Sequence, residues 1–167
     1  MQRLILLRHA DAERASASGD FHRRLTAAGG EDARRIGRAL AARGLRPDLA
    51  LVSAAERARQ TWDAAHDAFG DVEVELDRGL YNATLSGLQV AVAAVGDRCE
   101  TLIVVGHNPG LHQFAVDLML QGSAAPTGLE GLAGGFPTAG AAVFVIDAAG
   151  HARYEMFLTP ADAGEPS

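Results

Sequence analysis

Cysteine is almost absent from this chain of 167 residues. Cys99 is the single cysteine, so no disulfide can link two parts of the chain. A lone thiol fits a reducing compartment, and we therefore expect a cytoplasmic protein. We interpret Cys99 as a buried or incidental thiol rather than as a nucleophile.

Long apolar segments are also missing. Apolar residues make up 48% of the chain, but no uninterrupted apolar run approaches the roughly 20 residues that a membrane-spanning helix needs. The N-terminus has no basic stretch followed by an apolar signal segment, because its first apolar run, residues 4–7, is short and meets Arg8 at once. The sequence therefore predicts a protein that is neither embedded in a membrane nor exported.

Lysine is absent altogether, and the formal net charge is −6. A negative net charge argues against a nucleic-acid-binding protein, since such proteins usually carry a basic face. The cations that exist are all arginines, and they are unevenly distributed. Many of them lie in the N-terminal part, among them Arg8, Arg14, Arg23, Arg24, Arg34, Arg35 and Arg38. We expect no nucleic-acid partner.

Strand-like and helix-like segments alternate along most of the chain. The predicted strands lie at residues 4–7, 49–52, 72–76, 101–106, 141–147 and 152–158. The predicted helices run from Thr26 as N-cap to Gly44, over residues 54–69 and 86–95, and from Pro109 with Asn108 as N-cap. The last two strands are predicted to be antiparallel, and residues 72–76 alternate as an edge strand does. This order predicts a three-layer α/β/α sandwich with a mostly parallel central sheet.

The ends of the domain are predicted from the same patterns. Residues 1–159 contain all of the expected elements, and residues 160–167 read as a flexible C-terminal tail. Residues 121–140 form a long loop, which is either a mobile rim over a site or a plain connection.

Polar residues follow three of the predicted strands. In chain order, they are Arg8 with His9, Ser53 with Arg57, and His107 with Asn108. Parallel strands bring their carboxyl ends to one edge of the sheet, where ligands of such folds bind. Two histidines and two arginines are therefore expected to meet there. Taken alone, Arg8 and His9 would be interpreted as a turn pair, Arg57 as a solvated helix arginine and His107 as a loop residue.

Such a cluster suits phosphoryl transfer. Arginine presents a planar fork of donors that grips phosphate in a bidentate manner. Arg57 falls in the first turn of its helix, where the free backbone N–H groups also favour anions. His9 could attack phosphorus through one ring nitrogen if a backbone carbonyl held the other. Adjacent cations would lower its pKa and keep it uncharged near neutral pH.

The motifs "RHA", "SAAERARQT" and "VVGHNPGL", with "RRLTAAGG" and "PTAGAAVFVID", resemble the histidine phosphatase (phosphoglycerate mutase-like) superfamily. The resemblance covers essentially the whole chain in motif order and is closest to the phosphohistidine phosphatases of the SixA type. It implies that His9 is the phosphorylated nucleophile and that Arg8, Arg57 and His107 form the phosphate pocket. It also implies that Arg23 touches phosphate or substrate, and that no metal or cofactor takes part.

Three positions depart from the family pattern. Ala10 stands where a glycine usually follows the histidine, and Arg24 replaces the proline of "RPLT". Many relatives carry a proton-donating glutamate in the segment "ELDRGLYNATLSGL", but Leu80-Tyr81-Asn82 offers none, and we move the role neither to Glu75 nor to Asp77. An alkoxide leaving group needs a general acid, whereas imidazole leaves neutral with a conjugate-acid pKa of roughly 6.5. The missing acid therefore favours P–N over P–O cleavage.

The function implied is removal of a phosphoryl group from phosphohistidine, with a histidine-phosphotransfer domain as the expected partner. A small phosphate ester is the alternative substrate. A module that binds phosphohistidine without hydrolysing it is the non-enzymatic alternative. A metal site built from His9, Asp11, His107, His112 and Asp117 is disfavoured, because His107 and His112 do not share a helix face and central arginines repel a dication.

Overall fold

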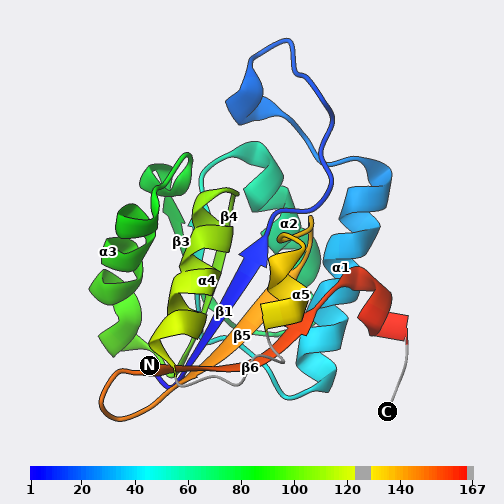
Figure 1. Ribbon diagram of the computed structural model, residues 1–167. Coiled ribbons are helices and arrows are strands. Elements are labelled where there is room, and N and C mark those ends of the chain that lie inside the picture. The colour runs from blue at the N-terminus through cyan, green and yellow to red at the C-terminus, as the bar shows by residue number, and fades with distance from the viewer. Residues whose placement is uncertain (123–128, 165–167) are drawn as a thin grey trace.

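The computed structural model describes residues 1–122 and 129–164, which form a sheet flanked by helices (Figure 1). Its strands are β1 (Arg3–Arg8), β2 (Leu49–Ser53), β3 (Glu73–Asp77), β4 (Thr101–Gly106), β5 (Ala141–Ile146) and β6 (Ala152–Leu158). They lie in the order β3-β2-β4-β1-β5-β6. The first four in this order are parallel, β5 runs antiparallel to β1, and β6 runs antiparallel to β5. The mostly parallel sheet is confirmed, with β3 at its edge.

The helices cover both faces of the sheet. They are α1 (Ala27–Ala42), α2 (Glu56–His66), α3 (Leu85–Val95), α4 (Gly110–Gln121) and the short α5 (Leu129–Ala133). In Figure 1, α1 and α2 lie on one side of the sheet, and α3 and α4 lie on the other. The predicted three-layer α/β/α sandwich is therefore confirmed.

Strand β1 explains why four large aliphatic residues stand in a row. Its side chains alternate between the two faces, as in any strand. Leu4 and Leu6 join the buried cluster under α3 and α4, while Ile5 and Leu7 join the cluster under α1 and α2. Each such side chain contributes roughly 1.5–3 kcal/mol when fully buried. Burial on both sides holds the carboxyl end of β1 rigidly in the middle of the sheet.

Two helix starts test the predicted caps. Thr26 caps α1, because its hydroxyl oxygen accepts a hydrogen bond from the Gly29 N–H at 3.0 Å. The prediction that Asn108 caps the fourth helix is wrong by one residue, since Pro109 occupies the cap position of α4. The Asn108 side chain instead donates to the carbonyl of Phe136 at 2.9 Å. A contact with a distant loop thus replaces the local one.

The long loop and the C-terminal tail contain more structure than predicted. Helix α5 lies within the segment that we expected to be a loop, and residues 123–128 of that segment lie outside the described residues. Residues Pro160–Gly164 form a short 3-10 helix against α1, so this part of the expected flexible tail is a regular element. The extent of the domain, residues 1–159, stays a prediction.

Two expectations from the composition concern the single cysteine and membrane-spanning helices. Cys99 is a free, buried thiol, and burial raises its pKa, which makes it a weak nucleophile. Within residues 1–122 and 129–164, no helix is both long enough and apolar enough to cross a membrane.

Candidate active site

The carboxyl ends of three neighbouring strands meet at one edge of the sheet. Residue Arg8 of β1 pairs with Gly106 of β4, and Val52 of β2 pairs with Val105 of β4. In Figure 1 the arrowhead of β1 points toward the blue loop that follows it. His9 and His107 come one residue after the paired ends, and their ring centres are 5.2 Å apart. Residues about one hundred positions apart in the sequence are therefore neighbours.

His9 is held in a single tautomer. Its Nδ1 lies 2.8 Å from the carbonyl oxygen of Ala10, and a carbonyl can only accept, so Nδ1 carries the proton. The Ala10 N–H in turn donates to the hydroxyl of Thr61, whose own proton goes to the carbonyl of Arg57. The turn after β1 is thus tied to α2. It leaves Nε2 of His9 with a free lone pair, which is the atom that a nucleophile needs.

His107 has the complementary arrangement. Its Nε2 lies 2.7 Å from the hydroxyl oxygen of Ser53. That oxygen accepts a hydrogen bond from the Ala55 N–H at 3.3 Å, so its own proton is available for Nε2 of His107. In the tautomer in which the Ser53 hydroxyl donates to Nε2, Nδ1 of His107 carries a hydrogen and is a donor. It is buried and has no hydrogen-bond partner within the described part of the chain.

Two arginines add further donors of the same kind. The Nε atoms of Arg8 and Arg57 are also buried without a partner among the described residues. Arg8 is held by a hydrogen bond of 2.9 Å from its Nη1 to the carbonyl of Phe136. A buried N–H group without an acceptor costs about 1–3 kcal/mol. Three such donors belong to residues that surround His9, and an oxyanion bound among them would satisfy them. We call them the donor cradle (Nε of Arg8, Nε of Arg57 and Nδ1 of His107).

Asp20 and Tyr81 also belong to this site, and sequence reasoning did not single them out. Nη1 and Nη2 of Arg57 donate to the carbonyl and to Oδ2 of Asp20, at 2.8 and 3.2 Å. The hydroxyl of Tyr81 donates to the same Oδ2. Arg23 donates from Nε to Oδ1 of Asp20 at 2.8 Å and from Nη1 to the carbonyl of Glu13 at 2.9 Å. Arg23 therefore reaches the site through Asp20.

The segment that lacks the family's glutamate supplies Tyr81 instead. The ring of Tyr81 is 5.7 Å from that of His107, and the guanidinium of Arg57 lies over it at 5.7 Å. Neither Glu75 nor Asp77 takes the acid's place. Glu75 pairs with Arg98 at 2.6 Å, and Asp77 caps the next turn through the Gly79 N–H at 2.7 Å.

The other departures from the family pattern are accommodated locally. Among the described residues other than glycine, positive φ angles occur at Asn82 and Ala139, so the backbone at Ala10 does not require glycine. Arg24 is exposed. Arg59, two residues beyond Arg57, is half exposed and pairs with Glu56 at 3.6 Å, so only Arg57 faces the site.

The alternative ligands of a metal site are engaged elsewhere. Nε2 of His112 lies 2.8 Å from the carbonyl of Leu132, and Asp117 accepts hydrogen bonds from Gln89 and Gln121. Over residues 1–122 and 129–164, no group of three or more histidine, cysteine or acidic side chains is arranged to hold a metal ion.

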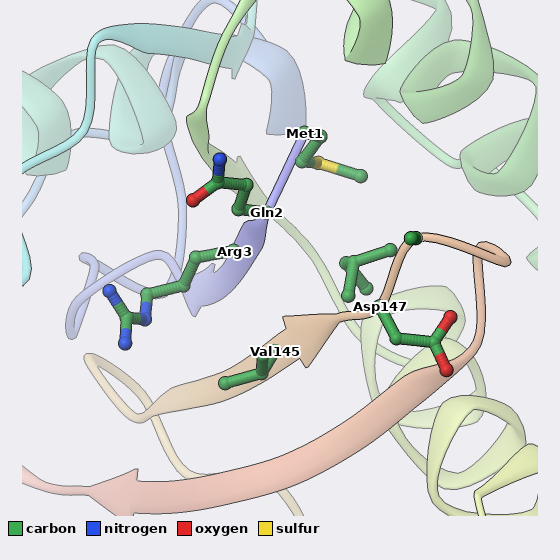
Figure 2. Close-up of a pocket in the computed structure, with 7 residues that line it drawn as sticks. Met1, Gln2, Arg3, Val145 and Asp147 are labelled. Atoms are coloured by element: carbon green, nitrogen blue, oxygen red, sulfur yellow. The ribbon is translucent and has the colours of Figure 1, made fainter.

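A separate hollow lies at the opposite end of β1 (Figure 2). It is lined by Met1, Gln2 and Arg3 and by residues 145–148 of β5 and the following turn. No histidine lines it, and its charged residues are Arg3 and Asp147. It is therefore unrelated to the donor cradle.

Burial keeps both histidines neutral. Burial, with Arg57 and Arg8 nearby, lowers the pKa of His9 to about 4. Burial, with His9 and Arg57 nearby, lowers the pKa of His107 to about 3. Asp20 is instead kept charged, because the Tyr81 hydroxyl, Arg57 and Arg23 lower its pKa to about 2. At neutral pH the site thus holds two neutral imidazoles, one carboxylate and three guanidiniums.

These pKa values predict how stability depends on pH. The ordinary histidine pKa of 6.5 lies above the folded values of about 4 and about 3, so the unfolded chain binds protons that the folded chain does not. We expect the free energy of unfolding to fall as the pH is lowered from 6.5 toward 4, and His107→Asn should make that fall shallower. Urea unfolding at a series of pH values measures this pH dependence of the free energy of unfolding, with His151→Asn at an exposed turn as control. An equal slope in His107→Asn and the wild type would contradict it.

Comparison with known proteins identifies the family of this chain. The sequence model of the Histidine phosphatase superfamily (branch 1) matches residues 4–91. The chain belongs to this superfamily. A crystal structure of a proposed phosphohistidine phosphatase SixA from Agrobacterium tumefaciens is 34% identical, with a TM-score of 0.82, and the match covers 95% of this chain and 99% of that one.

Two further relatives extend the histidine phosphatase comparison. A proposed SixA from Nakamurella multipartita is 29% identical, with a TM-score of 0.82, over 95% of this chain and 96% of that one. An uncharacterised protein of Mycobacterium tuberculosis is 33% identical over 145 residues, which is 87% of this chain and 89% of the relative. Superfamily membership and the SixA likeness indicate a phosphatase with the phosphoglycerate mutase-like fold.

Proposed function

We propose that this protein is a phosphohistidine phosphatase that forms a covalent phosphohistidine on His9. One observation carries the proposal. Nε2 of His9 has a free lone pair, and it stands beside a donor cradle of buried N–H groups without partners among the described residues. A nucleophile next to donors that fit a phosphoryl group is the combination that phosphoryl transfer requires.

The reaction proceeds in two displacements. The phosphoryl group docks on Arg8, Arg57 and His107, and Nε2 of His9 attacks phosphorus in line. The bond to the leaving group breaks, and the ring of His9 becomes a phosphorylated imidazolium. Its positive charge is stabilised by the carbonyl of Ala10, which accepts the Nδ1 proton at 2.8 Å. Water then attacks the phosphorus, and His9 leaves as the neutral imidazole with its Nδ1 proton retained.

The site has little capacity to donate a proton to a leaving group, which favours P–N substrates. Asp20 has a pKa of about 2 and holds no proton at neutral pH. The Asp20 carboxylate raises the pKa of Tyr81, so its hydroxyl gives up its proton reluctantly. An ester that leaves as an alkoxide needs a proton, whereas an imidazole leaves neutral without one. Phosphohistidine is therefore the substrate class that this site handles best.

The remaining parts of the proposal concern the partner and the compartment. The compact chain has little material to insert over the strand ends, which suits a phosphohistidine presented on the surface of another protein. We propose a histidine-phosphotransfer domain as partner, a role in signal transduction, a cytoplasmic location, and activity without metal or cofactor. The likeness to proposed SixA phosphohistidine phosphatases supports this substrate.

A substrate panel assayed with chelator tests this function. Phosphohistidine and phosphoramidate should be hydrolysed at least about tenfold faster than an alkyl phosphate, a difference of ~1.4 kcal/mol in activation free energy. Chelator should not change these rates. A preference for the alkyl ester would identify a small-ester phosphatase instead. Activity lost with chelator and restored by zinc or manganese would establish a metal enzyme, and binding of phosphohistidine without turnover would establish a binding module.

A further inference from the structure

Asp20 occupies a distinctive place beside the donor cradle. Arg57 connects the two, because its Nε lies in the buried cradle while both of its Nη atoms donate to Asp20. His9 is buried, with 8% of its surface exposed, whereas the side chain of Asp20 is 55% exposed. His9 therefore forms the inner wall of the site and Asp20 lies at its mouth. A carboxylate is unexpected there, since it repels the phosphoryl group that must enter.

The carboxylate of Asp20 has acceptor capacity to spare. Oδ2 accepts from Arg57 and Tyr81, while Oδ1 accepts from Arg23 alone among the described side chains. A carboxylate has about four acceptor positions, so Oδ1 keeps one. Three side chains hold the group in place, and they leave this position available to a donor arriving from solvent.

We propose that Asp20 is a specificity-determining residue that accepts a hydrogen bond from the leaving imidazole of phosphohistidine. This inference rests on the proposed function. In-line attack by buried His9 directs the leaving group away from it, toward the exposed side of the site where Asp20 lies. The imidazole that leaves carries an N–H on the ring nitrogen that is not bonded to phosphorus. Oδ1 of Asp20 is the acceptor for that N–H.

The chemistry balances without a proton transfer. The substrate enters as a phosphorylated imidazolium, with its second ring nitrogen protonated and bound to Asp20. The bond from phosphorus to Nε2 of His9 forms as the P–N bond of the substrate breaks, and that electron pair returns to the leaving imidazole. The leaving imidazole departs neutral with its N–H, and His9 becomes the phosphorylated imidazolium. Asp20 and the carbonyl of Ala10 thus play corresponding parts on the two rings.

The same carboxylate disfavours esters. An alcohol that leaves from phosphorus develops negative charge on its oxygen, and Asp20 would face that charge from the mouth of the site. Like charges at close range repel, and the repulsion increases when water is excluded. If Asp20 acted only by repelling the phosphoryl group of any substrate, its removal would raise the rate of hydrolysis of every substrate equally. The proposal instead requires opposite effects on P–N and P–O substrates.

The test compares phosphoimidazole with phenyl phosphate in the wild type and in Asp20→Asn. We expect Asp20→Asn to lower the ratio of their kcat/KM values at least about tenfold, through slower phosphoimidazole hydrolysis and unchanged or faster ester hydrolysis. Tyr81→Phe, which keeps the carboxylate but removes one of its donors, should leave the ratio within about threefold. Glu31→Gln removes another half-exposed carboxylate paired with an arginine, at 3.2 Å from Arg34, and should change nothing.

The pH dependence supplies a second readout. Asp20 stabilises the protonated form of bound phosphoimidazole, so kcat in the wild type should fall with rising pH at a higher pH than in Asp20→Asn. An unchanged ratio in Asp20→Asn, or an equal fall in Tyr81→Phe, would overturn the inference while leaving the proposed function intact. Wild-type protein that hydrolyses neither compound would overturn the proposed function, and the inference with it.

Discussion

Replacement of His9 by alanine should abolish phosphatase turnover, with kcat reduced by at least about 10⁴-fold. No other described side chain of the site offers an unprotonated nucleophile in the same position, because Nε2 of His107 is bound to Ser53 and its Nδ1 carries the hydrogen when Ser53 donates to Nε2. The donor cradle would still bind phosphate in His9→Ala. We therefore expect inorganic phosphate to bind within about threefold of its wild-type affinity while turnover is lost.

His151→Ala is the matched control for His9→Ala. His151 lies at an exposed turn and pairs with Asp147 at 3.4 Å, far along the sheet from the strand ends. Its loss should leave kcat and KM unchanged. Turnover that survives in His9→Ala, or that falls equally in His151→Ala, would refute the assignment of His9 as nucleophile.

Replacement of Arg57 by alanine should lower kcat by about 10²–10⁴-fold. Arg57 is buried, with 5% of its surface exposed, and its Nε points into the donor cradle. Its charge is needed most when negative charge is spread over the equatorial oxygens of the transition state. Arg57→Lys keeps a charge but loses the fork of donors, and we expect it to recover only part of the activity.

Arg59→Ala on the same helix distinguishes this role from general loss of charge. Arg59 is half exposed and pairs with Glu56, so its removal should change kcat by less than about twofold. Arg57 also holds Asp20, and thermal unfolding of each variant measures any loss of stability separately. An equal loss of activity in Arg59→Ala, or full activity in Arg57→Ala, would contradict the account.

The fold could be predicted because its signals are local. Residues 4–7 and 101–106 are apolar enough to require burial on both faces, which places them in the centre of a parallel sheet. The carboxyl ends of such strands share one edge, so the convergence of His9, Arg57 and His107 follows from the order of elements. The register of β1 and β4 then sets which residues stand side by side.

Asp20 and Tyr81 were not found because their roles are tertiary. Asp20 follows a polar segment with no periodic pattern and begins a single 3-10 turn, Asp20–His22, and its partner Arg57 is 37 positions away. Tyr81 stands in the segment whose one feature in the sequence is the missing glutamate of the family. The spacing of Asp20 and Arg23 was the one local signal, since residues three apart in a helical turn can pair. The cap at Pro109 was missed for the same reason, because the Phe136 carbonyl that binds Asn108 comes from a distant loop.

Direct detection of a phosphorylated His9 tests the central claim. The wild-type protein is mixed with phosphoramidate and quenched without acid during turnover, and its peptides are mapped by mass spectrometry. The account predicts a phosphoryl group on the peptide that contains His9, at that residue, and none in His9→Ala. Continued turnover with no phosphoryl group on the protein, or with the group on another residue, would contradict it.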